Sequence, residues 1–318
     1  MIEVKHLTKR YGNHTAVSDL SFTIEKGQIY GFLGPNGAGK STTMNIMTGC
    51  LAATAGDVTI GGYDIFEEAE AAKRLIGYLP EQPPLYLDRT PREYLNFVAD
   101  AKCIPAKEKP AEIQRVMALT QIEDVAGRLI KNLSKGYKQR VGIAQAILGD
   151  PEVIILDEPT VGLDPRQIIE IRELIQQLGK DHTVILSSHI LSEVQAVCQT
   201  ILIISKGKLV ACDSPENLER LFAGTTTVEL DAEATEEEIS AIVAPIAGIR
   251  KVTVTKQQGG ICRVLLDSTD TDGQALCRAL FFAFSAANRA ILRMTMAKAS
   301  LEDIFMELTA AESKEEGK

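Results

Sequence analysis

The sequence predicts an α/β fold, in which a parallel sheet forms the core of a large N-terminal domain and a small α+β domain follows. Three observations support this prediction. A strand-like segment, residues 28–32, leads into a glycine-rich loop and then a helix that begins near Gly39. Two apolar runs, 153–156 and 184–186, lie between helical segments, as is typical of strands buried on both faces of a parallel sheet. After residue 224 the elements follow the order β, α, β, β, α, β, which indicates a ferredoxin-like domain.

The length of 318 residues exceeds the size at which a single hydrophobic core usually stops growing, so two domains are expected. In the first, Gly61 and Gly62 separate two short apolar segments and predict a β-hairpin. Thr90, with Glu93 three residues later, predicts a capped helix, and Pro110 predicts the start of a second one. The expected boundaries are a core domain over 1–220 with a helical region over about 84–150, a small domain over 225–310, and a charged tail over 311–318.

Composition excludes several classes of function. A net charge of -9 argues against broad binding to nucleic acid or to an anionic lipid surface. Six cysteines without a C-x-x-C pair indicate reduced thiols and a cytosolic compartment. No stretch approaches the ~18 uninterrupted apolar residues of a membrane helix, so any membrane-spanning part of the function is expected to belong to another chain.

The glycine-rich segment GPNGAGKST follows a predicted strand and precedes a predicted helix, which is the setting of a phosphate-binding loop. Lys40 can reach the β and γ oxygens of a nucleotide, and the Ser41 hydroxyl is placed to ligate Mg²⁺. By average residue frequencies, such a match arises by chance in about one chain of this length in a hundred. Phosphate contacts are therefore expected from Gly34, Pro35, Asn36, Gly37, Ala38, Gly39, Lys40, Ser41 and Thr42.

The buried strand in VIILDEP ends in two carboxylates at the edge of the sheet where the phosphate loop is expected. Asp157 can hold magnesium through water, and Glu158 is placed to polarise an attacking water as the general base. An acidic helix cap would explain one carboxylate but hardly two in tandem. These two motifs alone would equally suit a GTPase, a kinase or a helicase motor.

The segment LSKGYKQR, residues 133–140, narrows this choice because it resembles the signature motif of the ABC ATPase family. Ser134 is expected to cap a helix that runs to Leu148 and whose free N–H groups face an anion. The resemblance implies that Ser134 and Gly136 contact the γ-phosphate of an ATP bound to the opposite subunit. The usual motif has glycine in place of Lys135 and glutamine in place of Tyr137.

Four further residues match family motifs in the expected order along the chain. The resemblance implies that Tyr11 stacks on adenine, that Gln82 contacts magnesium and links the site to the membrane partner, and that Asp164 lies in a segment crossing to the partner subunit. It also implies that His189 contacts the γ-phosphate. Singly, each has an ordinary structural interpretation, and only the ordered set favours the functional one. The expected catalytic residues are Lys40, Glu158 and His189, and the expected metal-site residues are Ser41, Gln82 and Asp157.

The resemblance covers residues 1 to about 220 and implies a P-loop NTPase core with an antiparallel β subdomain and a helical subdomain. The appended domain and the segment SLEDIFMELT, 300–309, resemble the drug and multidrug exporter ATPases of the ABC type-two class. An amphipathic helix docking onto a core is the alternative for that segment. The implied function is ATP hydrolysis with Mg²⁺ at the cytoplasmic face of a membrane. A closing dimer, of two copies or of this chain and a related one, would drive export by separate permease subunits.

Two other functions remain open. One is a soluble ABC ATPase that acts in DNA repair or on ribosomes, which the single phosphate loop and the lack of sustained heptads disfavour. The other is a non-enzymatic nucleotide sensor, which Glu158 disfavours. The transported substrate is not determined by this chain.

Overall fold

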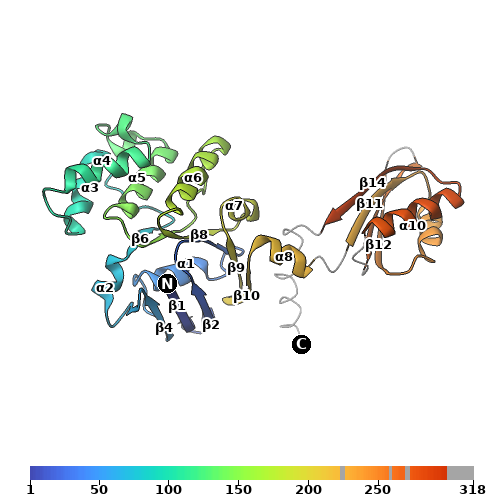
Figure 1. The fold of residues 1–318 in the computed structure, drawn as a ribbon, viewed down its shortest axis with the longest axis horizontal. Coiled ribbons are helices and arrows are strands. Elements are labelled where there is room, and N and C mark those ends of the chain that lie inside the picture. The colour runs from blue at the N-terminus through green and yellow to red at the C-terminus, as the bar shows by residue number, and fades with distance from the viewer. Residues whose placement is uncertain (223–225, 258–259, 269–272, 299–318) are drawn as a thin grey trace. The chain divides into compact units, whose positions relative to one another are not determined.

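The computed structural model describes residues 1–222, 226–257, 260–268 and 273–298 (Figure 1). The chain divides into two compact units, Met1–Ser214 and Pro215–Lys318. The predicted segments over 300–309 and 311–318 lie outside the described residues.

The first unit is built around a six-stranded sheet with the order β10-β9-β3-β8-β7-β6. All neighbouring strands are parallel except β9 and β10, which pair antiparallel at one edge. The side chains of β3 and β7 are buried throughout, as the uninterrupted apolar runs predict. The strands are β3 (Ile29–Leu33), β6 (Ile76–Leu79), β7 (Val153–Leu156), β8 (Thr183–Ser188), β9 (Thr200–Ser205) and β10 (Lys208–Asp213).

The first unit also contains a four-stranded antiparallel sheet with the order β2-β1-β4-β5. The predicted hairpin is confirmed: Ile60 pairs with Tyr63, and Gly61 and Gly62 between them have φ values of 62° and 91°, which only glycine adopts readily. One hydrophobic cluster contains residues of both sheets together with Met44, Ile46 and Met47 of helix α1 (Lys40–Met47). The strands are β1 (Ile2–Tyr11), β2 (His14–Ile24), β4 (Ala55–Ile60) and β5 (Tyr63–Asp64).

Three helices between β6 and β7 form a helical region, coloured green in Figure 1. Thr90 and Glu93 make the predicted capping box, in which the Thr90 hydroxyl accepts from the Glu93 N–H and the Glu93 carboxylate accepts from the Thr90 N–H. The three helices are α3 (Pro91–Ala101), α4 (Lys109–Leu119) and α5 (Lys135–Ile147), with short 3₁₀ turns at Glu123–Val125 and Ile130–Asn132. The remaining helices of this unit are α2 (Ala69–Arg74), α6 (Pro165–Leu178) and α7 (Leu191–Gln195).

The second unit has the predicted order β, α, β, β, α, β after an initial helix, α8 (Pro215–Phe222). Its sheet is antiparallel with the order β12-β13-β11-β14, the arrangement of a ferredoxin-like fold. Side chains of β11 and β13 on one face of the sheet are buried with those of the two helices. These elements are β11 (Thr226–Ala232), α9 (Glu236–Val243), β12 (Ile249–Lys256), β13 (Cys262–Ser268), α10 (Gly273–Ala286) and β14 (Ile291–Lys298).

Candidate active site

The phosphate-binding loop joins β3 to α1, and two of its glycines are required by close backbone contacts. A Cβ on Gly34 would lie 2.3 Å from the carbonyl oxygen of Ile204. Gly39 has a φ of 104°, and a Cβ there would lie 2.6 Å from the carbonyl oxygen of Ala16. The loop is therefore held tightly against neighbouring backbone at its start and end, with the N-terminus of α1 directed into a cavity.

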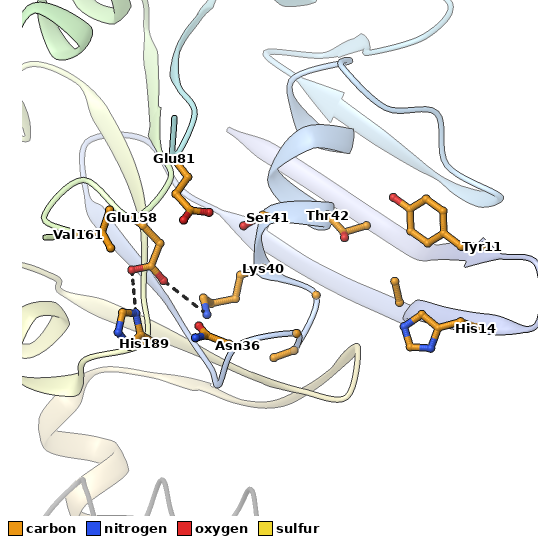
Figure 2. A pocket seen from close by; sticks show the side chains of 14 residues that line it. Tyr11, His14, Asn36, Lys40, Ser41, Thr42, Glu81, Glu158, Val161 and His189 are labelled. Atoms are coloured by element: carbon orange, nitrogen blue, oxygen red, sulfur yellow. Dashed lines mark hydrogen bonds and ion pairs between the residues drawn. The ribbon is translucent and has the colours of Figure 1, made fainter. Parts of the chain in front are cut away.

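This cavity has a volume of about 490 Å³ and is lined by residues from five separate segments of the first unit. Figure 2 shows the side chains of Lys40, Glu158 and His189 converging there. The lining residues are Tyr11, His14, Ala16, Asn36, Gly37, Ala38, Gly39, Lys40, Ser41, Thr42, Glu81, Glu158, Val161 and His189.

Lys40 and Glu158 form a buried ion pair at the base of the cavity. The Lys40 Nζ lies 3.6 Å from Glu158 Oε1 and donates to the carbonyl oxygens of Gly34 and Pro35 at 2.7 and 3.3 Å. Burial lowers the pKa of Lys40, against the opposing effect of the Glu158 and Asp157 charges. His189, at the end of β8, places its Nδ1 atom 3.0 Å from Glu158 Oε2.

Ser187, which the sequence analysis did not single out, holds the Asp157 carboxylate and the backbone of Glu158 at the end of β7. The Ser187 hydroxyl donates to Asp157 Oδ1 at 2.6 Å and accepts from the Glu158 N–H at 2.8 Å. Glu158 has a φ of 48°, a left-handed conformation that costs energy in a residue with a side chain. The Ser41 hydroxyl donates to the same Asp157 oxygen at 3.2 Å. Ser41, on the helix that follows β3, and Asp157, at the end of β7, are therefore in direct contact.

A second residue that the sequence analysis missed is Glu193 of α7. Its side chain is buried, and its Oε2 atom accepts from the Thr160 hydroxyl at 2.5 Å and from the Ser188 hydroxyl at 2.9 Å. Thr160 follows Glu158 by two residues, and Ser188 directly precedes His189. Glu193 therefore ties together the two loops that carry this pair of side chains.

The signature-like segment of the same unit lies outside this cavity. Ser134 caps α5 as predicted, accepting from the Tyr137 N–H at 3.3 Å, and Asp164 caps α6, accepting from the Gln167 N–H at 2.9 Å. The two helix starts are adjacent, because a Cβ on Gly136 would lie 2.7 Å from the Gln167 side chain. Ser134, Gly136 and Asp164 do not line the cavity that contains Lys40.

The two residues that depart from the usual signature motif are accommodated within the chain. The Lys135 amine lies over Gly162, where an added Cβ would approach it to 2.1 Å. The Tyr137 hydroxyl donates to Asp124 Oδ2 at 2.7 Å, a hydrogen bond that raises the pKa of Tyr137. The Lys135 ammonium therefore lies beside the loop between β7 and α6, and the Tyr137 hydroxyl is hydrogen-bonded within the helical region.

At the loop after β6, the residue in the cavity is Glu81 and not the predicted Gln82, which is absent from the lining. At the far end of the cavity, Tyr11 lies opposite His14 across the β1–β2 hairpin, with the Lys9 amine 5.1 Å from the centre of its ring. His14 was not predicted. Over the described part of the chain, no three His, Cys, Asp or Glu side chains converge closely enough to hold a metal ion by themselves.

Comparison with known proteins gives a consistent result. The family described as ABC transporter matches residues 17–161. The linearmycin resistance ATP-binding protein LnrL of Bacillus subtilis is 32% identical over 97% of this chain and 98% of its own. The bacitracin transport ATP-binding protein BcrA of Bacillus licheniformis is 35% identical over 97% of both chains.

Solved structures agree with this comparison. An ATP-binding subunit of an ABC transporter superposes with a TM-score of 0.64 at 31% identity, over 70% of this chain and 93% of that one. A dimeric, post-hydrolysis state of an ATP-binding cassette with bound ADP and Pi gives a TM-score of 0.62 at 25% identity, over 67% of this chain and 98% of that one.

The parallel sheet, the phosphate loop and the carboxylate pair thus define an ATP-binding cassette ATPase. With these relatives matched along almost their entire lengths, the chain belongs to the family of ABC transporter ATP-binding proteins. It is an ATP-binding and ATP-hydrolysing subunit of an ABC transporter. Within the described ranges, we find no helix with the length and hydrophobicity needed to span a membrane.

Proposed function

We propose that this chain hydrolyses MgATP at a site that a second ATPase subunit completes, and that the resulting closure drives export through separate permease subunits. One observation carries the two-subunit part of this proposal. Lys40, Glu158 and His189 gather in one cavity, whereas Ser134 and Gly136 lie outside it on the same chain. A second copy or a related chain would place its Ser134 and Gly136 over the γ-phosphate.

In this proposal the phosphate loop from Gly34 to Thr42 wraps the nucleotide phosphates, and Tyr11 stacks on the adenine. Glu158 accepts a hydrogen bond from the water that attacks the γ-phosphorus in line with the departing β–γ bridging oxygen. His189 holds the Glu158 carboxylate and contacts the γ-phosphate. The products are ADP and inorganic phosphate, whose separation favours reopening of the dimer.

The hydroxyl of Ser41 and the carboxylate of Asp157 fit a magnesium ion, because Mg²⁺ prefers oxygen donors and takes its other ligands from phosphates and water. When bound, the ion neutralises charge that develops on the β- and γ-phosphates. Asp164, at the start of α6, is assigned to the contact with the partner subunit.

A mixing experiment tests the two-subunit site. Lys40→Ala and Gly136→Asp each inactivate a homodimer, but a mixed dimer contains one site built from an unaltered Lys40 and an unaltered Gly136. ATPase activity should therefore rise when the two inactive proteins are mixed. Mixtures that stay as inactive as the separate proteins would contradict a site shared between subunits.

We propose that the permease binds to a pair of exposed aromatic side chains in the helical region, close in sequence to the loop after β6. Tyr86 and Phe97 are 45% and 49% exposed, and their ring centroids lie 5.1 Å apart. Exposed aromatic pairs of this kind are typical of protein interfaces. Export is proposed because the full-length relatives are named for resistance to linearmycin and transport of bacitracin.

Purification from membranes tests the permease proposal. The unaltered chain should copurify with an integral membrane subunit, and Phe97→Glu should release it while ATP binding by the isolated chain is retained. Copurification with ribosomes or DNA would instead favour the soluble ABC ATPases.

We further propose that residues 1–220 form the ATPase domain and that 225–310 form an accessory domain. A chain ending at residue 224 should still bind ATP, because the cavity residues all precede this point. Its dimerisation and transport, compared with those of the full chain, would show what the second unit contributes. Loss of ATP binding would contradict the proposed boundary.

A further inference from the structure

Helix α10 of the second unit (Figure 1) exposes two adjacent phenylalanines to solvent. Leu276, Leu280 and Phe284, spaced four residues apart, face the core of this unit and are buried there. Phe281 and Phe282 are 54% and 66% exposed, and their rings meet edge to face with centroids 5.5 Å apart. Among the described residues, Phe282 is the most exposed large hydrophobic side chain. Packing of the unit therefore does not account for this pair.

The segment that carries the two rings is basic, although the chain as a whole has a net charge of -9. Residues 273–298 contain four Lys or Arg residues and neither Asp nor Glu. Arg278 precedes Phe281 and Phe282 by three and four residues, so the three side chains are neighbours on the helix surface. Within the described ranges, Arg278 makes no hydrogen bond or ion pair, whereas Arg289 is paired with a carboxylate. An unpaired guanidinium thus lies beside two exposed aromatic rings.

We propose that the outer face of α10, defined by Arg278, Phe281 and Phe282, docks on the surface of a phospholipid bilayer that contains anionic lipids. Exposed apolar side chains mark sites of interaction, and aromatic residues beside basic ones are typical of helices that lie in the membrane interface. The two rings enter the boundary between headgroups and acyl chains. The Arg278 guanidinium donates hydrogen bonds to the oxygens of a lipid phosphate.

The distribution of charge favours a lipid surface as the partner. Outside residues 273–298, the chain has an excess of Asp and Glu over Lys and Arg, so an anionic surface repels most of the molecule and attracts this segment. The contact of one helix face is weak. A permease that holds the chain at the bilayer, as proposed above, raises the effective concentration of the two surfaces and makes a weak contact sufficient. The contact then holds the second unit against the membrane, a role that goes beyond the proposed function.

A fluorescence experiment tests whether this face enters the bilayer. The chain contains no tryptophan, so Phe282→Trp gives a signal from this face alone. When vesicles of phosphatidylcholine and phosphatidylglycerol are added to this full-length variant, its emission should shift to shorter wavelength, because the ring leaves water. Vesicles of phosphatidylcholine alone should give a smaller shift. Phe97→Trp, at an exposed position on α3, is the matched control and should show no shift.

Cosedimentation with the same mixed vesicles measures the affinity. Phe281→Gln combined with Phe282→Gln keeps the helix propensity and should weaken binding by about tenfold or more, because apolar area is no longer removed from water. Arg278→Gln should weaken binding by about fivefold and make it less sensitive to salt. Ile169→Gln removes a comparably exposed apolar side chain from α6 and should leave binding unchanged.

Two results would overturn the inference: an emission of the Phe282→Trp chain that mixed vesicles leave unchanged, or equal vesicle binding by the double variant and the unaltered chain. If that emission shifted without vesicles, when the chain was bound to permease subunits in detergent, and not with vesicles, the face would be a protein-docking surface and the inference would also fail. None of these measurements involves ATP, so their failure would leave the proposed ATPase site in place.

Discussion

His189 Nδ1 lies 3.0 Å from Glu158 Oε2, although the two residues follow different strands of the parallel sheet. The other oxygen of the same carboxylate lies 3.6 Å from Lys40 Nζ. Glu158 is thus fixed from both sides, by a ring that is partly exposed and an ammonium that is buried. A carboxylate held in this way can orient a water without first paying the entropy of its own ordering.

Replacing His189 with alanine should remove one of these two constraints. We expect turnover to fall by about a hundredfold, the lower range for loss of a positioned acid–base group, while ATP affinity changes little. Steady-state hydrolysis and equilibrium nucleotide binding measure the two effects separately. Equal losses in both would indicate that His189 contributes to binding and not to the chemical step.

Glu193→Ala should weaken both the fold and the catalytic geometry. It leaves the buried hydroxyls of Thr160 and Ser188 without their acceptor, at a cost of about 1–3 kcal/mol in the free energy of unfolding. Because these hydroxyls belong to the loops that carry Glu158 and His189, turnover should also fall. Urea unfolding measures the first effect and ATPase assays the second.

Glu173→Ala provides a matched control, since Glu173 is exposed on α6 and belongs to neither loop. It should leave both unfolding and turnover unchanged. If Glu193→Ala were as stable and active as this control, the proposed connection between the two loops would be wrong.

The stability of the helical region should depend on Glu112 in a pH-dependent way. Glu112 accepts two hydrogen bonds from Arg115 and one from the Gly149 N–H, and these hold its pKa below the usual 4.5. A lowered pKa means that the stabilisation is complete above pH 4.5 and is lost as the pH falls through the folded-state pKa.

Glu112→Gln should therefore lower the free energy of unfolding at pH 7 by about 1 kcal/mol, and the difference from the unaltered chain should shrink in acid. Urea unfolding at several pH values between neutrality and acid measures this. Glu108→Gln, at an exposed position one turn earlier that makes no cap hydrogen bond, should show no such difference. A Glu112 effect that stayed constant with pH would rule out the ionised contact as its cause.

The parts of the fold that local sequence patterns specify could be predicted. In the phosphate loop, close backbone contacts at Gly34 and Gly39 leave no room for a Cβ. The glycine pattern in the sequence therefore predicts the conformation of the loop. Thr90 and Glu93 are three residues apart and bond each other directly. The alternation of strands and helices in the second unit was likewise visible in its order of elements.

The residues that were missed depend on contacts between distant segments. Ser187 joins Asp157 and Glu158 from a neighbouring strand, 30 and 29 residues away in sequence, and no local pattern marks that connection. In the sequence, Glu193 is indistinguishable from other glutamates of amphipathic helices, because its two hydroxyl partners become apparent only in the structure. At the loop after β6, the sequence analysis selected Gln82 alone, and the direction of the chain leaving the strand places the preceding residue, Glu81, in the cavity.

The central claim, that Glu158 activates the attacking water in a closing dimer, is tested most directly by Glu158→Gln. This change keeps the size of the side chain and removes its charge. We expect ATP binding to persist, steady-state hydrolysis to fall by about a hundredfold or more, and ATP to trap a dimer visible by analytical ultracentrifugation. Hydrolysis at the rate of the unaltered chain would contradict the account.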